Sequence, residues 1–211
     1  MTTSSHAAVV VMVGPPGSGK STWCSGRFLT DELFSLDAFR RVLADDVADM
    51  SATEPAALML HTVVRERSRR GLVTVADACN TLPARRGPVV AAAREFGVPV
   101  LAVVTTTPPA VCRQRNAQRD GVVAPYPGAN PRRVPDAAVA RIVDEARANP
   151  VRVGEVDAVL TLTPDGGPLS WEGCLPPAVL SAPWLADTMG APWIPADRVP
   201  PPAGRALRVV R

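Results

Sequence analysis

The sequence predicts an α/β fold with a parallel sheet covered by helices on both faces, and three observations support it. Short apolar runs alternate with longer segments of helical periodicity over residues 7–163. A glycine-rich turn directly follows the first apolar run. The 211 residues suffice for one such domain with a proper core and are too few for two large ones. We therefore expect one α/β domain over residues 7–163.

The first apolar run, residues 7–13, contains no polar side chain and is typical of a buried strand. It leads into the segment Gly14-Pro15-Pro16-Gly17-Ser18-Gly19-Lys20-Ser21-Thr22, which matches the Walker A pattern between a strand and a helix start. Backbone N–H groups of such a loop form a cradle for an anion, and the helix N-terminus adds partial positive charge. The motif predicts a P-loop that binds ATP through these nine residues.

Lys20 and Ser21 carry the chemistry of this loop. Lys20 is expected to reach the β- and γ-phosphates, and the Ser21 hydroxyl is expected to ligate Mg²⁺. Lys20 is also the only lysine of the chain, whereas every other member of its 23 Lys and Arg residues is an arginine. A compact ammonium suits a phosphate cradle better than a planar guanidinium does, which supports the phosphate-binding interpretation.

Further apolar runs and periodic segments complete the predicted fold. Strands are expected at 32–36, 72–76, 98–105 and 156–162, and helices at 37–44, 54–70, 83–96, 109–119 and 135–148. Together they predict a P-loop NTPase of the kinase type, a three-layer sandwich with a five-stranded parallel sheet and a helical lid. Ligands in such folds bind at the carboxyl ends of the strands, where the pattern places Asp37 and Asp77.

Asp37 and Arg40 lie three residues apart at a predicted helix start and therefore share a helix face. A carboxylate there can orient and deprotonate an acceptor hydroxyl as it attacks the γ-phosphate. A simple N-cap role for Asp37 is the alternative. Asp77 ends an apolar strand, as Walker B aspartates do, and is expected to hold Mg²⁺ through water or to anchor an arginine. Capping of the next helix is the alternative for Asp77.

Arg115 and Arg119 lie four residues apart on a predicted helix, so their guanidinium groups share one side. Arginines aimed at a triphosphate neutralise the charge that develops during transfer, an effect of roughly 10³–10⁵ in rate. The loop at 120–133 that follows favours a closing lid. A solvated basic face is the alternative interpretation.

Residues 164–211 differ in composition from the rest of the chain. They hold ten of the 23 prolines and three of the four tryptophans, namely Trp171, Trp184 and Trp193. We expect a Pro/Trp-rich tail that is poorly structured or draped on the domain. A role of these tryptophans in docking or substrate binding is the alternative.

The composition argues against several other classes of protein. The scattered cysteines Cys24, Cys79, Cys112 and Cys174 have no metal-type spacing, and His6 and His61 are too few and too isolated for a ligand set. No apolar stretch approaches membrane-spanning length, and the start of the chain lacks the features of a signal peptide. We expect a cytoplasmic protein without membrane association, and the sequence leaves the oligomeric state open, a homo-oligomer included.

The combination of these motifs resembles the polynucleotide 5′-hydroxyl kinase family, in particular the kinase module of phage and bacterial end-healing enzymes. The matching segments begin at Gly14, Ser35, Val75 and Arg113, and the resemblance covers about residues 8–162. It implies transfer of the ATP γ-phosphate to a 5′-OH end of RNA or DNA with Mg²⁺. It also implies that Lys20 and Ser21 bind the phosphates and the metal, and that Asp37 is the general base. Arg40 would contact Asp37 and the phosphate next to the acceptor hydroxyl. Arg115 and Arg119 would be lid arginines on the phosphates.

The sequence departs from this family in two ways. Cys79 stands where a threonine is usual, and no phosphatase or ligase signature accompanies the kinase motifs. Basic side chains for an acceptor groove would be Arg65, Arg69, Arg85, Arg86, Arg132 and Arg133. Two alternatives remain, namely a P-loop kinase of a small-molecule, sugar-nucleotide or tRNA-linked hydroxyl, and a non-catalytic ATP-binding regulator.

Overall fold

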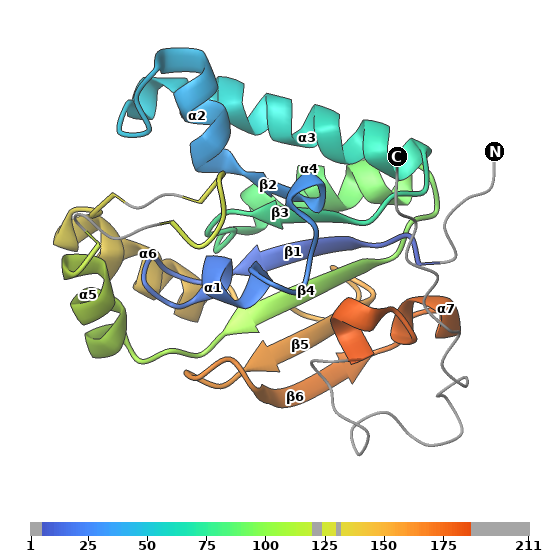
Figure 1. Ribbon diagram of the computed structural model, residues 1–211. Helices are drawn as coiled ribbons and strands as arrows, with labels where there is room; N and C mark the ends of the chain where they lie inside the picture. Colours follow the sequence, from blue (N-terminus) through green and yellow to red (C-terminus); the bar gives the residue numbers. More distant parts are fainter. Residues whose placement is uncertain (1–5, 120–123, 130–131, 187–211) are drawn as a thin grey trace.

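The computed structural model describes residues 6–119, 124–129 and 132–186, and its centre is a six-stranded sheet of order β2-β3-β1-β4-β5-β6 (Figure 1). The first five strands are parallel and the sixth is antiparallel. The strands are β1 Val9–Val13, β2 Leu33–Ser35, β3 Thr74–Asp77, β4 Val100–Thr105, β5 Ala158–Leu162 and β6 Pro168–Gly173. The carboxyl ends of β1 and β4 point toward the side of the molecule that holds α1 and α5 (Figure 1).

Seven α-helices connect or flank these strands within the described ranges. They are α1 Lys20–Cys24, α2 Leu36–Ala44, α3 Thr53–Arg69, α4 Pro83–Arg94, α5 Pro109–Ala117, α6 Asp136–Ala148 and α7 Pro177–Leu180. Two short 3₁₀ helices, η1 Thr30–Glu32 and η2 Met50–Ala52, precede β2 and α3. The bounds of α2 to α6 and of β1 to β5 agree with the sequence-based expectations to within a few residues, whereas α7 lies in the segment that was expected to be a tail.

Strand β1 lies at the centre of two hydrophobic cores because its side chains alternate between the faces of the sheet. On one face, Val10 and Met12 belong to a cluster with residues of α1 and α7. On the other face, Val9, Val11 and Val13 contact apolar residues of α3 and α4. All five residues of β1 are buried, so the strand holds the P-loop in a fixed position between the layers.

The predicted α/β fold with a P-loop after the first strand is confirmed, whereas the predicted number of five strands is wrong. Strand β6 pairs antiparallel with β5, with Leu160 opposite Trp171. Its residues are half-buried or exposed, and Leu169 is exposed. An edge strand with few buried side chains carries little hydrophobic pattern, which explains why the sequence analysis assigns it to the tail.

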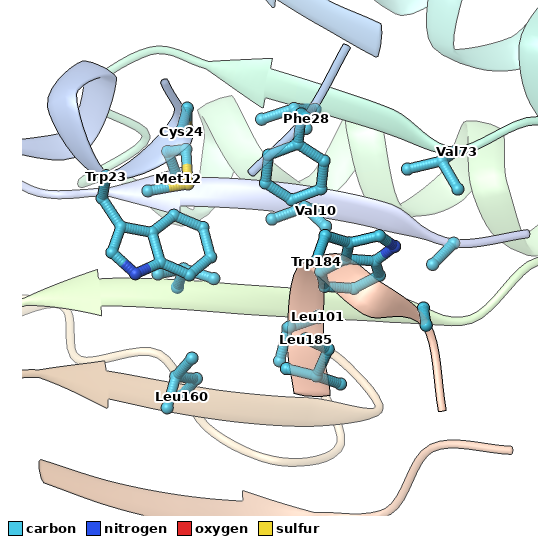
Figure 2. Packing of buried hydrophobic residues seen from close by; sticks show 14 of the residues in the cluster. Val10, Met12, Trp23, Cys24, Phe28, Val73, Leu101, Leu160, Trp184 and Leu185 are labelled. Carbon is cyan, nitrogen blue, oxygen red and sulfur yellow. The ribbon is translucent and has the colours of Figure 1, made fainter. Parts of the chain in front are cut away.

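The segment after β6 adds an aromatic contribution to the core. Phe28 contacts both Trp23 and Trp184, with ring centroids 5.9 Å and 5.1 Å apart, as Figure 2 shows. Leu175 and Leu185 of the same segment are buried in this cluster. Residues 164–186 thus pack against the sheet, while the third tryptophan of the predicted tail, Trp193, lies outside the described residues.

Across the described part of the chain, no helix combines the length and the apolar character that crossing a bilayer requires.

Candidate functional site

The P-loop is packed so closely that two of its positions accept only glycine. A Cβ atom on Gly14 would lie 2.0 Å from Thr105 Oγ1, and one on Gly17 would lie 2.3 Å from the Cys112 carbonyl oxygen. Gly17 also has a φ of +79°, which disfavours any L side chain. The Gly14 N–H donates to the Cys79 carbonyl at 2.9 Å, so the loop is held from the exit of β3 as well.

The Lys20 ammonium lies inside the curve of this loop. Its Nζ donates to the carbonyl oxygens of Gly14 at 2.9 Å and Pro15 at 3.0 Å. An ammonium has three donors, so one remains for an anion. The Ser18 hydroxyl oxygen is buried and has no hydrogen-bond partner among the described residues. A free donor and an unsatisfied hydroxyl on the same loop are what a bound phosphate would satisfy.

Asp77 and Ser21 meet at the carboxyl edge of the sheet. The Ser21 hydroxyl donates to Asp77 Oδ2 at 2.7 Å, and Asp77 is only 6 % exposed. The N-cap of α4 is Leu82, so Asp77 does not cap the following helix. Carboxylate and hydroxyl oxygens are the hard donors that Mg²⁺ prefers, so the pair fits a magnesium ion accompanied by nucleotide phosphates.

The sequence analysis missed one residue of this edge, Tyr126. Its hydroxyl donates to the same oxygen, Asp77 Oδ2, at 2.5 Å. Burial and the neighbouring Asp77 carboxylate raise the pKa of Tyr126 above its usual range. Tyr126 is the only tyrosine of the chain and lies in a Gly- and Pro-rich loop, so no periodic pattern could identify it.

Asp37 lies in the first turn of α2 but does not cap it. The Ser35 hydroxyl caps this helix by accepting from the N–H groups of Asp37 at 3.1 Å and Ala38 at 3.4 Å. The Asp37 carboxylate instead forms an ion pair with Arg40. Ser35 pairs in register with Asp77 across β2 and β3, which places the start of α2 at the same sheet edge as Asp77.

Arg40 is buried where α2 meets the segment that leads into α3. Its Nη1 donates to Thr53 Oγ1 at 3.3 Å, and the Asp37 carboxylate accepts from its Nη2. Burial lowers the pKa of Arg40, and the neighbouring positive charge of Arg132 lowers it further. Because an arginine pKa lies far above neutrality, the group stays charged. Arg40 therefore brings a cation to the side of the site that holds Asp37.

A cavity of about 490 Å³ opens beside the P-loop. It is lined by Gly17, Ser18, Gly19, Lys20, Ser21, Thr22, Trp23, Arg27, Thr105, Arg115, Arg119, Ala124, Pro125, Ala129, Leu162, Thr163, Pro164, Asp165 and Gly166. Both predicted lid arginines thus face the same space as the P-loop residues. Asp37, Arg40 and Asp77 are not part of this lining; Asp77 is linked to it through Ser21.

The two lid arginines have different surroundings. Helix α5 ends at Ala117, so Arg119 lies just beyond it rather than on a helical turn with Arg115. Arg115 is exposed, and its Nη2 donates to the Pro164 carbonyl at 3.3 Å. Burial lowers the pKa of Arg119, and the nearby Cys79 and Asp77 partly oppose this effect. Arg119 therefore lines the cavity and also interacts electrostatically with Asp77.

Most arginines that were expected to form a basic acceptor groove are engaged by carboxylates. Four of the pairs lie at the surface and one is buried; they are Arg65–Glu95, Arg69–Glu66, Arg85–Glu54, Arg133–Asp136 and Arg86–Glu155. Each pair reduces the positive field that a polyanion would meet. Of the six candidates, Arg132 is placed near Arg40 and Arg119.

Comparison with known proteins gives the following matches. The family model described as an AAA domain matches residues 9–148. No curated protein matches the sequence. A chain of the PezAT chromosomal toxin–antitoxin system of Streptococcus pneumoniae has a TM-score of 0.59 and 16% identity, covering 89% of this chain and 80% of that chain.

Two further solved structures resemble the chain. Kti12 of Chaetomium thermophilum, in complex with ADP-AlF3, has a TM-score of 0.58 and 15% identity, covering 74% of this chain and 88% of that chain. A chain of the Pnkp1/Rnl/Hen1 RNA repair complex has a TM-score of 0.54 and 20% identity, covering 68% of this chain and 45% of that chain. At such identities these likenesses show the fold alone.

Proposed function

The chain belongs to the AAA domain family, and on this premise we propose that it transfers the γ-phosphate of ATP to a hydroxyl group. The preferred acceptor is the 5′-OH end of a polynucleotide. The observation that carries the proposal is the presence of Asp37 at the sheet edge that holds Asp77, which in turn accepts from Ser21 of the P-loop. A protein that only binds ATP needs no carboxylate there, whereas phosphotransfer to a hydroxyl needs a proton acceptor.

Each residue of the site then has a defined task. Lys20 and the loop N–H groups bind the β- and γ-phosphates, and Asp37 takes the proton of the acceptor hydroxyl as its oxygen attacks the γ-phosphorus. The bond between the γ-phosphorus and the bridging oxygen breaks, and ADP leaves. Arg115 and Arg119 stabilise the phosphate charge from the cavity wall. Mg²⁺, held by Ser21 and by Asp77, would offset the negative charge of the phosphates.

The charge distribution favours recognition of the end of a chain over recognition of a long track. The positive charge of Arg132 lowers the pKa of both Arg40 and Arg119, so positive charge is concentrated on this side of the site. The outer arginines on α3 and α4 are paired with carboxylates instead. An acceptor that carries an anionic group beside its hydroxyl fits this concentration of positive charge. The phosphate next to a terminal nucleotide provides such a group.

A small anionic hydroxyl compound is the second candidate acceptor, and the same pairing of the outer arginines favours it. The arginines of α3 and α4 that are paired with carboxylates would add little to the binding of a polymer, so added nucleotides would contribute little through them. The two acceptors differ in how activity depends on oligomer length and on salt.

The test is transfer of labelled γ-phosphate to 5′-OH RNA and DNA oligomers of increasing length and to small phosphorylated alcohols, with Mg²⁺. Labelled oligomer that depends on Lys20, Asp37 and Arg119 supports the polynucleotide end as acceptor. Arg113→Ala is the matched control for Arg119→Ala, since Arg113 is exposed on α5 and does not line the cavity. Label only in a small compound supports the second candidate, and ATP binding without any transfer contradicts the proposed function.

A further inference from the structure

Tyr126 connects two parts of the site that are distant in sequence. Its hydroxyl donates to Asp77 Oδ2 at 2.5 Å, and the Ser21 hydroxyl donates to the same oxygen at 2.7 Å. Two hydroxyl donors on one carboxylate oxygen fix its position from opposite segments of the chain. Tyr126 is 7 % exposed, so this hydrogen bond is shielded from water.

The Asp77 carboxylate that Tyr126 contacts also lies next to the start of α2. Ser35, the residue that caps α2, pairs in register with Asp77, the residue that accepts from Tyr126. Ser35 in turn accepts from the N–H of Asp37 at 3.1 Å. The hydrogen bonds from Tyr126 and Ser21 thus meet on Asp77, directly across β2 and β3 from the residue that caps α2.

The segment around Tyr126 is anchored on both sides. The Ser25 hydroxyl donates to the Pro125 carbonyl at 2.9 Å, and Arg41 Nη2 donates to the Pro127 carbonyl at 3.4 Å. Gly128 leaves room for the Tyr126 ring, since a Cβ there would lie 3.1 Å from its Cε2 atom. These contacts tie the segment that carries Tyr126 to the end of α1 and to α2, the helix that carries Asp37.

We propose that Tyr126 is a positioning residue that holds Asp77 in the orientation required for the nucleotide-bound metal and couples it to the helix that carries Asp37. This inference rests on the proposed function. Removing a group that orients a metal-binding carboxylate costs about 10–100-fold in metal affinity or activity. A residue that only fills space beside Asp77 would change stability and leave the response to metal unaltered.

The experiment compares the wild type with Tyr126→Phe, which keeps the ring and removes the hydroxyl. ATP affinity is measured by calorimetry in EDTA and across a Mg²⁺ titration, and phosphotransfer is measured over the same titration. We expect equal affinities in EDTA, and an increase of about 10–100-fold in the Mg²⁺ concentration that gives half of the full effect in both assays. Thermal unfolding checks that the variant is folded.

Ser25→Ala is the matched control, because it loosens the same segment and leaves the Tyr126 hydroxyl in place. We expect its Mg²⁺ dependence to equal that of the wild type. Identical Mg²⁺ curves for Tyr126→Phe and wild type would overturn the inference, and so would a shift of equal size in Ser25→Ala.

The same data separate this inference from the proposed function. If the Mg²⁺ dependence of ATP binding shifts in Tyr126→Phe but no hydroxyl compound is phosphorylated, the proposed function fails and the positioning role of Tyr126 is supported. If the wild type binds no nucleotide with or without Mg²⁺, both are overturned.

Discussion

The Asp37 carboxylate forms an ion pair with the Arg40 guanidinium on α2, and Arg40 also donates to Thr53 at the start of α3. Ser35 takes over the capping of the helix. The buried Arg40 guanidinium therefore orients the Asp37 carboxylate, which does not serve as the helix cap. This arrangement suits a group that must accept a proton from a substrate.

Replacement of Asp37 by asparagine tests its role as general base. We expect Asp37→Asn to lower kcat by about 10²–10⁴ because the amide cannot accept the hydroxyl proton. ATP affinity should change little, since Asp37 does not line the cavity beside the P-loop. Initial rates at saturating acceptor and calorimetry with MgATP measure the two effects. Asp45→Asn, at the other end of α2, is the matched control, and an equal loss of kcat there would contradict the assignment.

Lys20 offers a second test, which concerns the shape of the cation. Lys20→Ala should lower kcat by about 10²–10³, as loss of a donor to the transferred group does, and weaken ATP binding. Lys20→Arg should fail to restore either quantity, because the loop encloses a compact ammonium that donates to Gly14 and Pro15. Fluorescence titration with a labelled nucleotide and steady-state rates provide the measurements. Wild-type affinity in Lys20→Arg would contradict this account of the loop.

Arg86 tests how the exit of β3 is held. The side chain is 1 % exposed, forms an ion pair with Glu155, and donates to the carbonyl oxygens of Asn80 and Thr81 at 3.0 Å each. Arg86→Ala leaves the half-buried Glu155 carboxylate and two carbonyl oxygens without their donor, and should lower the free energy of unfolding by about 3 kcal/mol. Urea denaturation measures the loss.

The matched control for Arg86 is Arg94 on the same helix. Arg94 is exposed and donates to the Gly154 carbonyl at 3.0 Å. Arg94→Ala should change the free energy of unfolding by less than about 1 kcal/mol. Equal losses in the two variants would show that the buried Arg86 contributes no more to the free energy of unfolding than the exposed Arg94 does.

The sequence predicts those parts of the site that depend on neighbours along the chain. The P-loop is a contiguous motif after a buried strand, and Asp77 follows directly from the end of an apolar run. Parallel strands bring their carboxyl ends to one edge, so the meeting of Ser21 and Asp77 follows from local patterns plus topology. Local information suffices for these residues.

Other parts depend on contacts that no local pattern encodes. Tyr126 meets Asp77 across 49 residues of sequence, and Arg65 meets Glu95 across 30. Such pairs offset the charge of the arginines. Counting arginines in the sequence therefore overestimates the positive charge of the predicted acceptor groove. Strand β6 escapes detection for a different reason, because an exposed edge strand has no buried face to produce alternation.

His61 provides a prediction about pH. Burial and the neighbouring Arg85 lower the pKa of His61, and Glu54 partly opposes them. The unfolded chain then binds the proton more tightly, so the free energy of unfolding should fall as the pH drops below about 6.5, the usual imidazole value. His61→Gln should abolish this part of the slope, and Arg85→Ala should reduce it. Urea denaturation between neutral and mildly acidic pH measures the slope, and an unchanged slope in His61→Gln contradicts the prediction.

Trp184 tests whether the segment after β6 belongs to the folded core. It is buried and contacts Phe28, which in turn contacts Trp23 beside the cavity. Trp184→Ala should lower the free energy of unfolding by about 3–5 kcal/mol, as loss of a buried aromatic ring does. Trp171→Ala, on the edge strand, should cost less than half as much, because this side chain is only partly buried against the core. Chemical denaturation of both variants measures the two losses of unfolding free energy. Equal and small losses would show that the segment after β6 does not unfold cooperatively with the domain.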